Sequence, residues 1–211
     1  MRLLLINTCG GEGVVALADE AGVLAAEPLP GRGTSEALMP AVRRLFAGVS
    51  FGVGDLDAVG VVNGPGSFTG VRVGLSAAKG LCEAGGVGMV AMSRLALVAA
   101  AVEAEDVVAV LDGGRGEFYC GVYCGGERVS EELLRGEEAR ASMAGGVAVT
   151  CEARVAERLG VRLEAEPGAE AMRAMVLRRI ETGAWSDVAT VDANYLRRTD
   201  AELLVQAKSK E

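Results

Sequence analysis

Residues 5–17 read LINTCGGEGVVAL, and residues 110–122, about half a chain further on, read VLDGGRGEFYCGV. Each stretch is an apolar run followed by one polar residue, a glycine-rich turn and an outgoing apolar run. This order predicts a buried strand that folds back on itself as a β-hairpin. Because the unit occurs twice, the sequence suggests two similar lobes that each open on a hairpin.

Two α/β lobes of this kind are the architecture of the actin-like ATPase fold, a ribonuclease H-like α/β class, and we expect that class here. We place the N-terminal lobe at residues 1–104 and the C-terminal lobe at 105–211, with a helix over 199–211 packing back on the first lobe. Hydrophobic spacing predicts the remaining elements. Strands are expected at 3–7, 14–18, 23–27, 57–63, 87–91, 107–112 and 117–123, and helices at 35–47, 68–84, 93–104, 151–160 and 168–182.

The composition excludes several kinds of chemistry. The chain has 211 residues, a net charge of -8 and no histidine. Without histidine it has neither a Ser-His-Asp or Cys-His nucleophile system nor a histidine-ligated metal site. Short arginine pairs occur, as at 43–44 and 178–179, but they form no basic stripe of the kind an isolated nucleic-acid binder carries. If RNA is a ligand, we expect another protein to hold it.

The five cysteines are scattered and odd in number, which is typical of free thiols in a reducing compartment. No apolar stretch is long enough, without glycine and charge, to span a bilayer. The apolar start at Leu3 ends at Asn7, so we interpret it as a strand rather than a signal peptide. We therefore expect a cytoplasmic protein without membrane contact.

The loop GPGSFTG at 64–70 follows a predicted strand and begins a helix, a context that suits anion binding at helix N-terminal amides. A dinucleotide loop needs G-x-G-x-x-G, and here Gly70 comes one residue too late. A Walker loop ends in G-K-[ST], and here Val71 and Arg72 follow Gly70. The other interpretation is that the glycines only let the strand turn tightly into the helix.

Small residues at Gly70, Gly74 and Ala78 lie on one face of the helix that follows. Such a stripe lets another element approach closely. It fits packing on the protein's own sheet and docking of a partner helix equally well. On the same helix, Ser76 and Lys79 match an S-x-x-K string. Without the companion strings S-D-N and K-T-G, that string is a weak signal of a nucleophile.

Charged residues lie at the tip of the second hairpin, among them Asp112 and Arg115. Carboxylates at such a tip can hold Mg²⁺ through water, although an ordinary solvated turn has the same composition. An active actin-like site would also need a carboxylate in the first hairpin, where this chain has Asn7. A neutral amide is a poor substitute for an anion beside a hydrated metal, so we expect neither ATP hydrolysis nor a metal in this subunit.

Three strings resemble the TsaB (YeaZ) family: GPGSFTGVRVGLSAAKGL at 64–81, DGGRGEFY at 112–119 and YLR at 195–197. The first is long and specific, and the resemblance is close up to the end of the second hairpin and patchy beyond it. Many relatives have Asp at Asn7, His at Thr34 and Arg at Gly114. The first and third departures weaken the case for a bound nucleotide, and the second alters a contact near the predicted interface helix.

The resemblance implies an actin-like fold with a degenerate nucleotide site and a non-catalytic role. TsaB-type proteins bind a homologous TsaD-type catalytic subunit and a TsaE-type small ATPase. Their complex transfers threonylcarbamoyl to N6 of the adenosine next to the anticodon of tRNA. This chain would then meet tRNA only through the complex and hold no cofactor alone. ATP or ADP would bind, if at all, at the interface with the partner.

In the family, two helices of the first lobe form the heterodimer face, and the same face forms homodimers. The resemblance implies no catalytic residue in this chain. It implies a degenerate nucleotide cleft at Asn7, Thr8, Gly64, Asp112 and Arg115. It also implies a partner interface on the helices at 35–47 and 68–84, at Leu38, Val42, Leu45, Gly70, Val71, Gly74 and Ala78.

Two enzyme hypotheses compete with the accessory role. An actin-like ATPase or small-molecule kinase acting alone predicts Mg-ATP binding, and Asn7 argues against it. A protease is the other, because the wider family was long labelled as glycopeptidases. The absence of histidine and the incomplete serine motif argue against that hypothesis.

Overall fold

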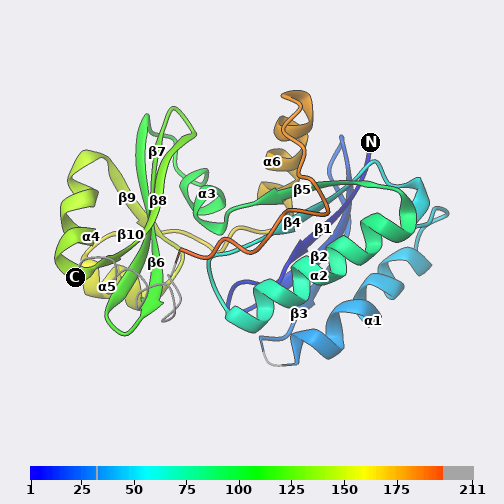
Figure 1. Cartoon of the computed structure of the whole chain (residues 1–211), viewed down its shortest axis with the longest axis horizontal. Helices are drawn as coiled ribbons and strands as arrows, with labels where there is room; N and C mark the ends of the chain where they lie inside the picture. The colour runs from blue at the N-terminus through cyan, green and yellow to red at the C-terminus, as the bar shows by residue number, and fades with distance from the viewer. Residues whose placement is uncertain (32, 197–211) are drawn as a thin grey trace, which may run out of the picture.

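Two five-stranded sheets, one in each half of the chain, organise the computed structural model, which describes residues 1–31 and 33–196 (Figure 1). The strand orders are β3-β2-β1-β4-β5 and β10-β9-β6-β7-β8. In each sheet the first strand pairs antiparallel with the second, the second antiparallel with the third, and the first parallel with the fourth. The shared topology confirms the repeat that the two hairpins predict.

The first sheet is sandwiched between helices. Its central strand, β1, is buried from Leu3 to Asn7, as expected for an apolar strand with a parallel neighbour. Helices α1 and α2 cover one face and α6 covers the other. We call this unit the first lobe. Its elements are β1 (Arg2–Asn7), β2 (Gly13–Asp19), β3 (Val23–Leu29), α1 (Thr34–Ala47), η1 (Val53–Asp55), β4 (Ala58–Val62), α2 (Phe68–Gly85), β5 (Gly88–Met92) and α6 (Ala169–Glu181).

The second sheet also has helices on both faces. Helix α3 packs on the face turned toward the first lobe, and α4 and α5 pack on the opposite face (Figure 1). We call this unit the second lobe. Its elements are α3 (Arg94–Ala99), β6 (Asp106–Gly114), β7 (Glu117–Cys124), β8 (Glu127–Arg135), α4 (Gly136–Ser142), η2 (Met143–Gly145), β9 (Val147–Thr150), α5 (Ala153–Leu159) and β10 (Arg162–Leu163).

The chain crosses between the lobes more than once. Helix α3 precedes the second sheet, yet its Leu95 and Val98 belong to that sheet's core. Helix α6 follows the second sheet, yet its Met172 and Val176 are fully buried on the first. The helix expected over 199–211 lies outside the described residues. None of the described helices is long and apolar enough to cross a membrane.

Several elements of the second half differ from expectation, since α3 is shorter than predicted and β8, α4, β9 and β10 were not predicted. The helix predicted over 93–104 is only α3, which ends at Ala99. Acidic side chains follow at Glu103 and Glu105, and negative charge is unfavourable at a helix C-terminus. The sequence also gave no signal for β8, whose residues are mostly exposed or half-buried and therefore show no clear apolar alternation.

Candidate functional site

A cleft of about 560 Å³ lies between the two hairpins, at the ends of which the sequence predicted a degenerate nucleotide cleft. One wall is the β1–β2 turn from Cys9 to Gly11, with Gly66 and Ser67 beside it. The other wall is the β6–β7 turn from Asp112 to Gly114 and the start of α5. The repeat thus brings both hairpin tips to one place. We call this feature the interlobe cleft.

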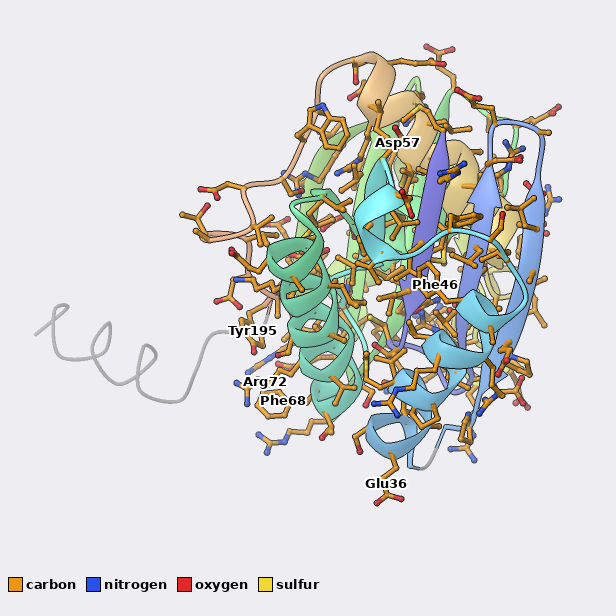
Figure 2. The ribbon with its side chains drawn as sticks, turned by 90° about the vertical axis from the view of Figure 1, so that its right-hand side faces the viewer. Glu36, Phe46, Asp57, Phe68, Arg72 and Tyr195 are labelled. Atoms are coloured by element: carbon orange, nitrogen blue, oxygen red, sulfur yellow. The ribbon has the colours of Figure 1, made fainter. Side chains whose placement is uncertain are left out.

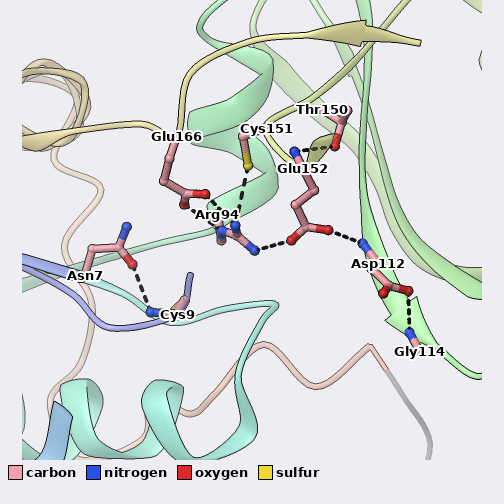
Figure 3. A network of polar contacts seen from close by, with 9 residues as sticks. All are labelled: Asn7, Cys9, Arg94, Asp112, Gly114, Thr150, Cys151, Glu152 and Glu166. Atoms are coloured by element: carbon pink, nitrogen blue, oxygen red, sulfur yellow. Dashed lines mark hydrogen bonds and ion pairs between the residues drawn. The ribbon is translucent and has the colours of Figure 1, made fainter. Parts of the chain in front are cut away.

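A buried arginine, Arg94, lines this cleft, and Figure 3 shows it between Glu166 and Glu152. Ser93 caps α3 by accepting a hydrogen bond from Leu95 N, which places Arg94 at the first helical position. The Arg94 side chain is only 4% exposed. Its backbone N–H donates to the carbonyl of Gly64 at 2.7 Å, which fixes the start of α3 against the 64–70 loop.

Two glutamates neutralise the Arg94 guanidinium. Its Nε and Nη2 donate to the two carboxylate oxygens of Glu166 at 2.8 and 2.5 Å, and its Nη1 donates to Glu152 at 2.9 Å. Burial alone would lower the pKa of Arg94, but the hydrogen bond and charge of Glu166 raise it above its ordinary value. Arg94 therefore stays a cation, and its bidentate contact with Glu166 has the geometry of a strong ion pair.

The same network links both hairpins. The second carboxylate oxygen of Glu152 accepts a hydrogen bond from Asp112 N at 2.7 Å, at the root of the second turn (Figure 3). Glu166 lies against the first turn, where a Cβ at Gly10 would be 3.0 Å from its Oε1. The ion-paired cluster of Arg94, Glu152 and Glu166 therefore links the two hairpins, and two of its members, Arg94 and Glu152, line the interlobe cleft.

The structure brings one of the five predicted cleft residues, Asp112, to the lining of the cleft. Its carboxylate accepts a hydrogen bond from Gly114 N at 2.8 Å, within its own turn. Asn7 is buried and its amide oxygen accepts from Cys9 N at 3.0 Å, so it shapes the first turn. Arg115 is exposed at the second tip in a left-handed conformation, with φ 55°.

The other two predicted cleft residues, Thr8 and Gly64, also lie outside the lining and support the fold. The buried hydroxyl of Thr8 donates to the carbonyl of Gly70 at 2.6 Å, tying β1 to the start of α2. Gly64 has φ 107°, a conformation that favours glycine, and begins the turn into α2. In the described part of the chain, no group of three or more His, Cys, Asp or Glu side chains could hold a metal ion.

Sequence reasoning missed Arg94, Glu152 and Glu166, the residues that dominate the cleft. One local signal exists, since Arg94 is a lone charge at the start of the apolar run LALVA. Its partners are 58 and 72 positions away in the chain, so no spacing rule connects them.

All seven residues predicted for the partner interface are buried within the chain, which corrects that expectation. Gly70 and Gly74 lie against β1, where an added Cβ would come within 2.0 Å of Thr8 O and 2.2 Å of Thr8 Oγ1. The small-residue stripe therefore packs on the protein's own sheet. The inward residues are Leu38, Val42 and Leu45 on α1 and Gly70, Val71, Gly74 and Ala78 on α2.

The outward sides of these two helices carry a different set of residues, which we call the outer face. On α2, Phe68 is 61% exposed and Arg72 lies over its ring, with Cζ 3.7 Å from the centroid. Arg72 Nε also donates to the hydroxyl of Tyr195 at 2.7 Å. Met39 on α1 is 39% exposed. Figure 2 shows Phe68, Arg72 and Tyr195 gathered at the first turns of α2.

Comparisons with known proteins relate the chain to one group of tRNA-modification proteins. A family model described as TsaD: tRNA N6-adenosine threonylcarbamoyltransferase matches residues 29–152. The protein named tRNA threonylcarbamoyladenosine biosynthesis protein TsaB in Escherichia coli (strain K12) is 32% identical over 145 residues, covering 67% of this chain and 62% of that protein. Its namesake in Haemophilus influenzae is 32% identical over 123 residues, covering 56% and 52%. The matches thus span less than two thirds of these curated relatives.

Solved structures agree over a larger share of the chain. The structure described as YeaZ from Pseudomonas aeruginosa has a TM-score of 0.77 and 27% identity, covering 92% of this chain and 99% of that one. The ethanolamine utilization protein EutJ from Carboxydothermus hydrogenoformans has a TM-score of 0.51 at 12% identity, covering 82% and 88%. The latter likeness concerns the fold alone, which is the expected actin-like ATPase fold.

Proposed function

The chain belongs to the TsaB (YeaZ) family, and from this premise we propose that it is a non-catalytic subunit in the biosynthesis of threonylcarbamoyladenosine in tRNA. In this proposal it binds a TsaD-type catalytic subunit and a TsaE-type small ATPase, and the assembly transfers threonylcarbamoyl to N6 of adenosine. The chain itself acts as a scaffold that activates its catalytic partner, and we infer that it works in the cytoplasm.

The observation that carries the non-catalytic role is the ion-paired cluster in the interlobe cleft. A nucleotide in this position needs cationic or amide donors for its phosphates and carboxylates for its metal. Here the buried cation, Arg94, is already bound by Glu166 and Glu152, and Glu152 also accepts from Asp112 N. Because its charge is already neutralised, Arg94 is not available to a nucleotide phosphate, which favours a scaffold over a kinase acting alone.

The exposed side of α1 and α2 supports the partner role. Exposed aromatic and arginine side chains are enriched at the centres of protein interfaces. Phe68, Arg72 and Tyr195 form such a group, and Met39 adds apolar surface on the neighbouring helix. We therefore move the proposed docking site from the buried stripe to the outer face. The same face is the proposed homodimer contact when the catalytic subunit is missing, and any ATP or ADP would bind where the two subunits meet.

The deciding experiment is an omit-one reconstitution. The catalytic subunit, the small ATPase, the adenylate-forming enzyme and tRNA are assayed for threonylcarbamoyladenosine with and without this protein, and the protein alone is assayed for ATPase activity. We expect product only when the protein is present and no ATP turnover by the protein alone. Product that is unchanged by its omission, or ATP hydrolysis by the isolated protein, would refute the proposal.

The competing enzyme hypotheses lack comparable support. For the protease, Ser76 would need a base, but Lys79 Nζ lies 3.4 Å from the carbonyl of Ala189 and donates to it. The kinase hypothesis is tested by the same reconstitution, because that experiment also assays the isolated protein for turnover of ATP.

A further inference from the structure

The segment that follows α6 connects the two lobes. Residues 187–196 form neither helix nor strand and run along the first lobe toward the second (Figure 1, orange to red). We call this segment the strap. Its backbone is held to the first lobe just after β4, where Asn194 N donates to the carbonyl of Asn63 at 2.8 Å. The side chain of Asn63 donates in turn to the carbonyl of Asp192 at 3.1 Å.

The side chain of Asn194 reaches the other lobe. Its Nδ2 donates to Glu131 Oε2 on β8 at 2.6 Å, and the hydroxyl of Tyr123 on β7 donates to Glu131 Oε1 at 2.5 Å. In the strand register Glu131 lies opposite Gly121, where an added Cβ would be 3.1 Å from Leu95 on α3. Glu131 is therefore on the face of the second sheet that is turned toward the first lobe. Asn194 thus contacts one lobe with its backbone and the other with its side chain.

A buried carboxylate at this place on β8 is unusual. The Glu131 side chain is only 2% exposed, although most of β8 is exposed or half-buried. Its ion pair with Arg128 is long, at 3.9 Å, so the neutral donors Tyr123 and Asn194 provide its short contacts. Burying a charged group is costly unless it accepts hydrogen bonds, and bonds to a charged acceptor are the stronger kind. Glu131 therefore holds the side chain of Asn194 firmly.

The next residue of the strap belongs to the outer face. Tyr195 is 49% exposed, and its hydroxyl accepts a hydrogen bond from Arg72 Nε at 2.7 Å. Its ring centroid lies 6.4 Å from that of Phe68, beside which Figure 2 shows it. Asn194 and Tyr195 share one peptide unit, so fixing Asn194 restricts where the Tyr195 ring can lie.

We propose that Glu131 is a positioning residue for docking of the catalytic partner, because it holds Asn194 and thereby keeps Tyr195 in the outer face. The inference rests on the proposed function, which places the partner on that face. A side chain that is ordered before binding loses less conformational freedom in the complex, so the affinity is higher. The second lobe then contributes to docking through the strap, while Glu131 itself stays buried.

A double-mutant cycle on the strap tests this coupling. The affinity for the catalytic subunit is measured by calorimetry for Asn194→Ala, Tyr195→Ala and the double variant. Asn194→Ala should weaken binding about tenfold, because the aromatic ring is no longer held in place. In the Tyr195→Ala background the same change should cost no more than about twofold, since the residue that Asn194 positions is gone. Unchanged affinity of Asn194→Ala, or two losses that multiply in full, would overturn the proposal.

Exchanging the two side-chain groups tests Glu131 itself. Asn194→Asp brings two carboxylates together and should weaken binding of the partner at about pH 8, well above ordinary carboxyl pKa values. Adding Glu131→Gln reverses the pair, because the new amide donates to the new carboxylate and its oxygen still accepts from Tyr123. Affinity should return to within about threefold of the unsubstituted protein. Absence of recovery would show that Glu131 does not position the strap, and this comparison decides also if Asn194→Ala fails to fold.

The matched control loosens the same C-terminal part of the chain at a different place. Ser186 Oγ accepts a hydrogen bond from Ala91 N at 2.9 Å, at the edge strand β5 and just before the strap. Ser186→Ala should leave partner affinity unchanged, because it does not release Asn194. An equal loss of affinity in Ser186→Ala and Asn194→Ala would mean general loosening rather than positioning, and would contradict the proposal.

Hydrogen exchange of the isolated protein separates this inference from the proposed function. Asn194→Ala should speed exchange of the amide at position 194, which is bonded to Asn63, by about tenfold or more, whereas Ser186→Ala should not. Unchanged exchange would show that the contact with Glu131 does not hold the strap, whatever the partner does. If exchange responds as expected but the unsubstituted protein does not bind the catalytic subunit, the proposed function is wrong and the docking role of Glu131 is refuted with it.

Discussion

Arg94 Nε lies 2.8 Å from Glu166 Oε1, a contact that joins residues 72 positions apart in the chain. Glu152 binds the other side of the same guanidinium at 2.9 Å and accepts a hydrogen bond from the second hairpin (Figure 3). Arg94 is held to the 64–70 loop, and Glu166 lies against the first hairpin. One cation therefore fixes the relative position of both walls of the interlobe cleft.

Replacing this cation should destabilise the protein strongly. In Arg94→Ala, two partly buried carboxylates lose their cation and lie close together without compensation. Breaking a buried ion pair from one side is costly for this reason, and we expect a loss of about 2–3 kcal/mol in the free energy of unfolding. Urea denaturation at neutral pH measures the change.

An exposed pair on the first lobe provides the control. Arg44 and Glu27 also form an ion pair, but the Arg44 side chain is 61% exposed. Exposed ion pairs contribute little to stability, so Arg44→Ala should shift the urea midpoint much less than Arg94→Ala. Equal shifts would mean that the cleft cluster is not a structural lock.

The small-residue stripe gives a second prediction. A Cβ at Gly74 would lie 2.2 Å from the buried Thr8 Oγ1, whereas one at Gly80 on the same helix meets nothing within 4 Å. Gly74→Ala should therefore cost about 1–3 kcal/mol by overpacking. Gly80→Ala should instead stabilise the helix by about 0.5–1 kcal/mol. Thermal or urea unfolding of both variants checks the opposite signs, and a neutral Gly74→Ala would contradict the close approach of α2 and β1.

Local patterns sufficed for the fold because the decisive signals are short-range. An apolar run, a polar residue and a glycine turn specify each hairpin, and the repeat then indicates two related sheets. The sides of α1 and α2 could not be assigned in the same way. Helical spacing shows that Gly70, Gly74 and Ala78 share a face, but small residues fit packing on a sheet and docking of a partner helix equally well. The contacts of Gly70 and Gly74 with Thr8 show that this face packs on the protein's own sheet.

The cleft cluster was beyond local patterns for a related reason. Arg94, Glu152 and Glu166 come from three separated segments of the chain. Charged side chains carry no periodic signal when each element contributes one. Whether such side chains come into contact depends on the order of the strands in the sheet and on the paths of the loops, which hydrophobic spacing does not determine.

Buried thiols predict how stability depends on pH. Burial raises the pKa of Cys9 and of Cys151 to about 12, so both stay neutral in the folded protein well above their ordinary range. In the unfolded chain these thiols ionise from about pH 9 upward, so unfolding releases protons there. The stability should then fall as pH rises from about 9 to 12, by about 1.4 kcal/mol per pH unit for each thiol.

Comparison with Cys9→Ser isolates this effect. Serine does not ionise in this range and keeps a donor for the carbonyl of Val62, which Cys9 Sγ contacts at 3.1 Å. The variant should therefore lose stability less steeply than the unsubstituted protein between pH 9 and 12. Parallel slopes in urea denaturation across that range would show that Cys9 is not buried as described.

The outer face gives the last prediction. Phe68 is 61% exposed, and its described ring contacts are to Arg72 and Tyr195, so Phe68→Ala should change the free energy of unfolding by less than about 0.5 kcal/mol. If the outer face docks the catalytic partner, the same substitution removes an aromatic anchor and should weaken binding about tenfold or more. Leu163→Ala is the matched control, because Leu163 is 52% exposed on the second lobe and should not affect binding. Calorimetric titration against the partner measures both, and equal affinities for the two variants would place the docking site elsewhere.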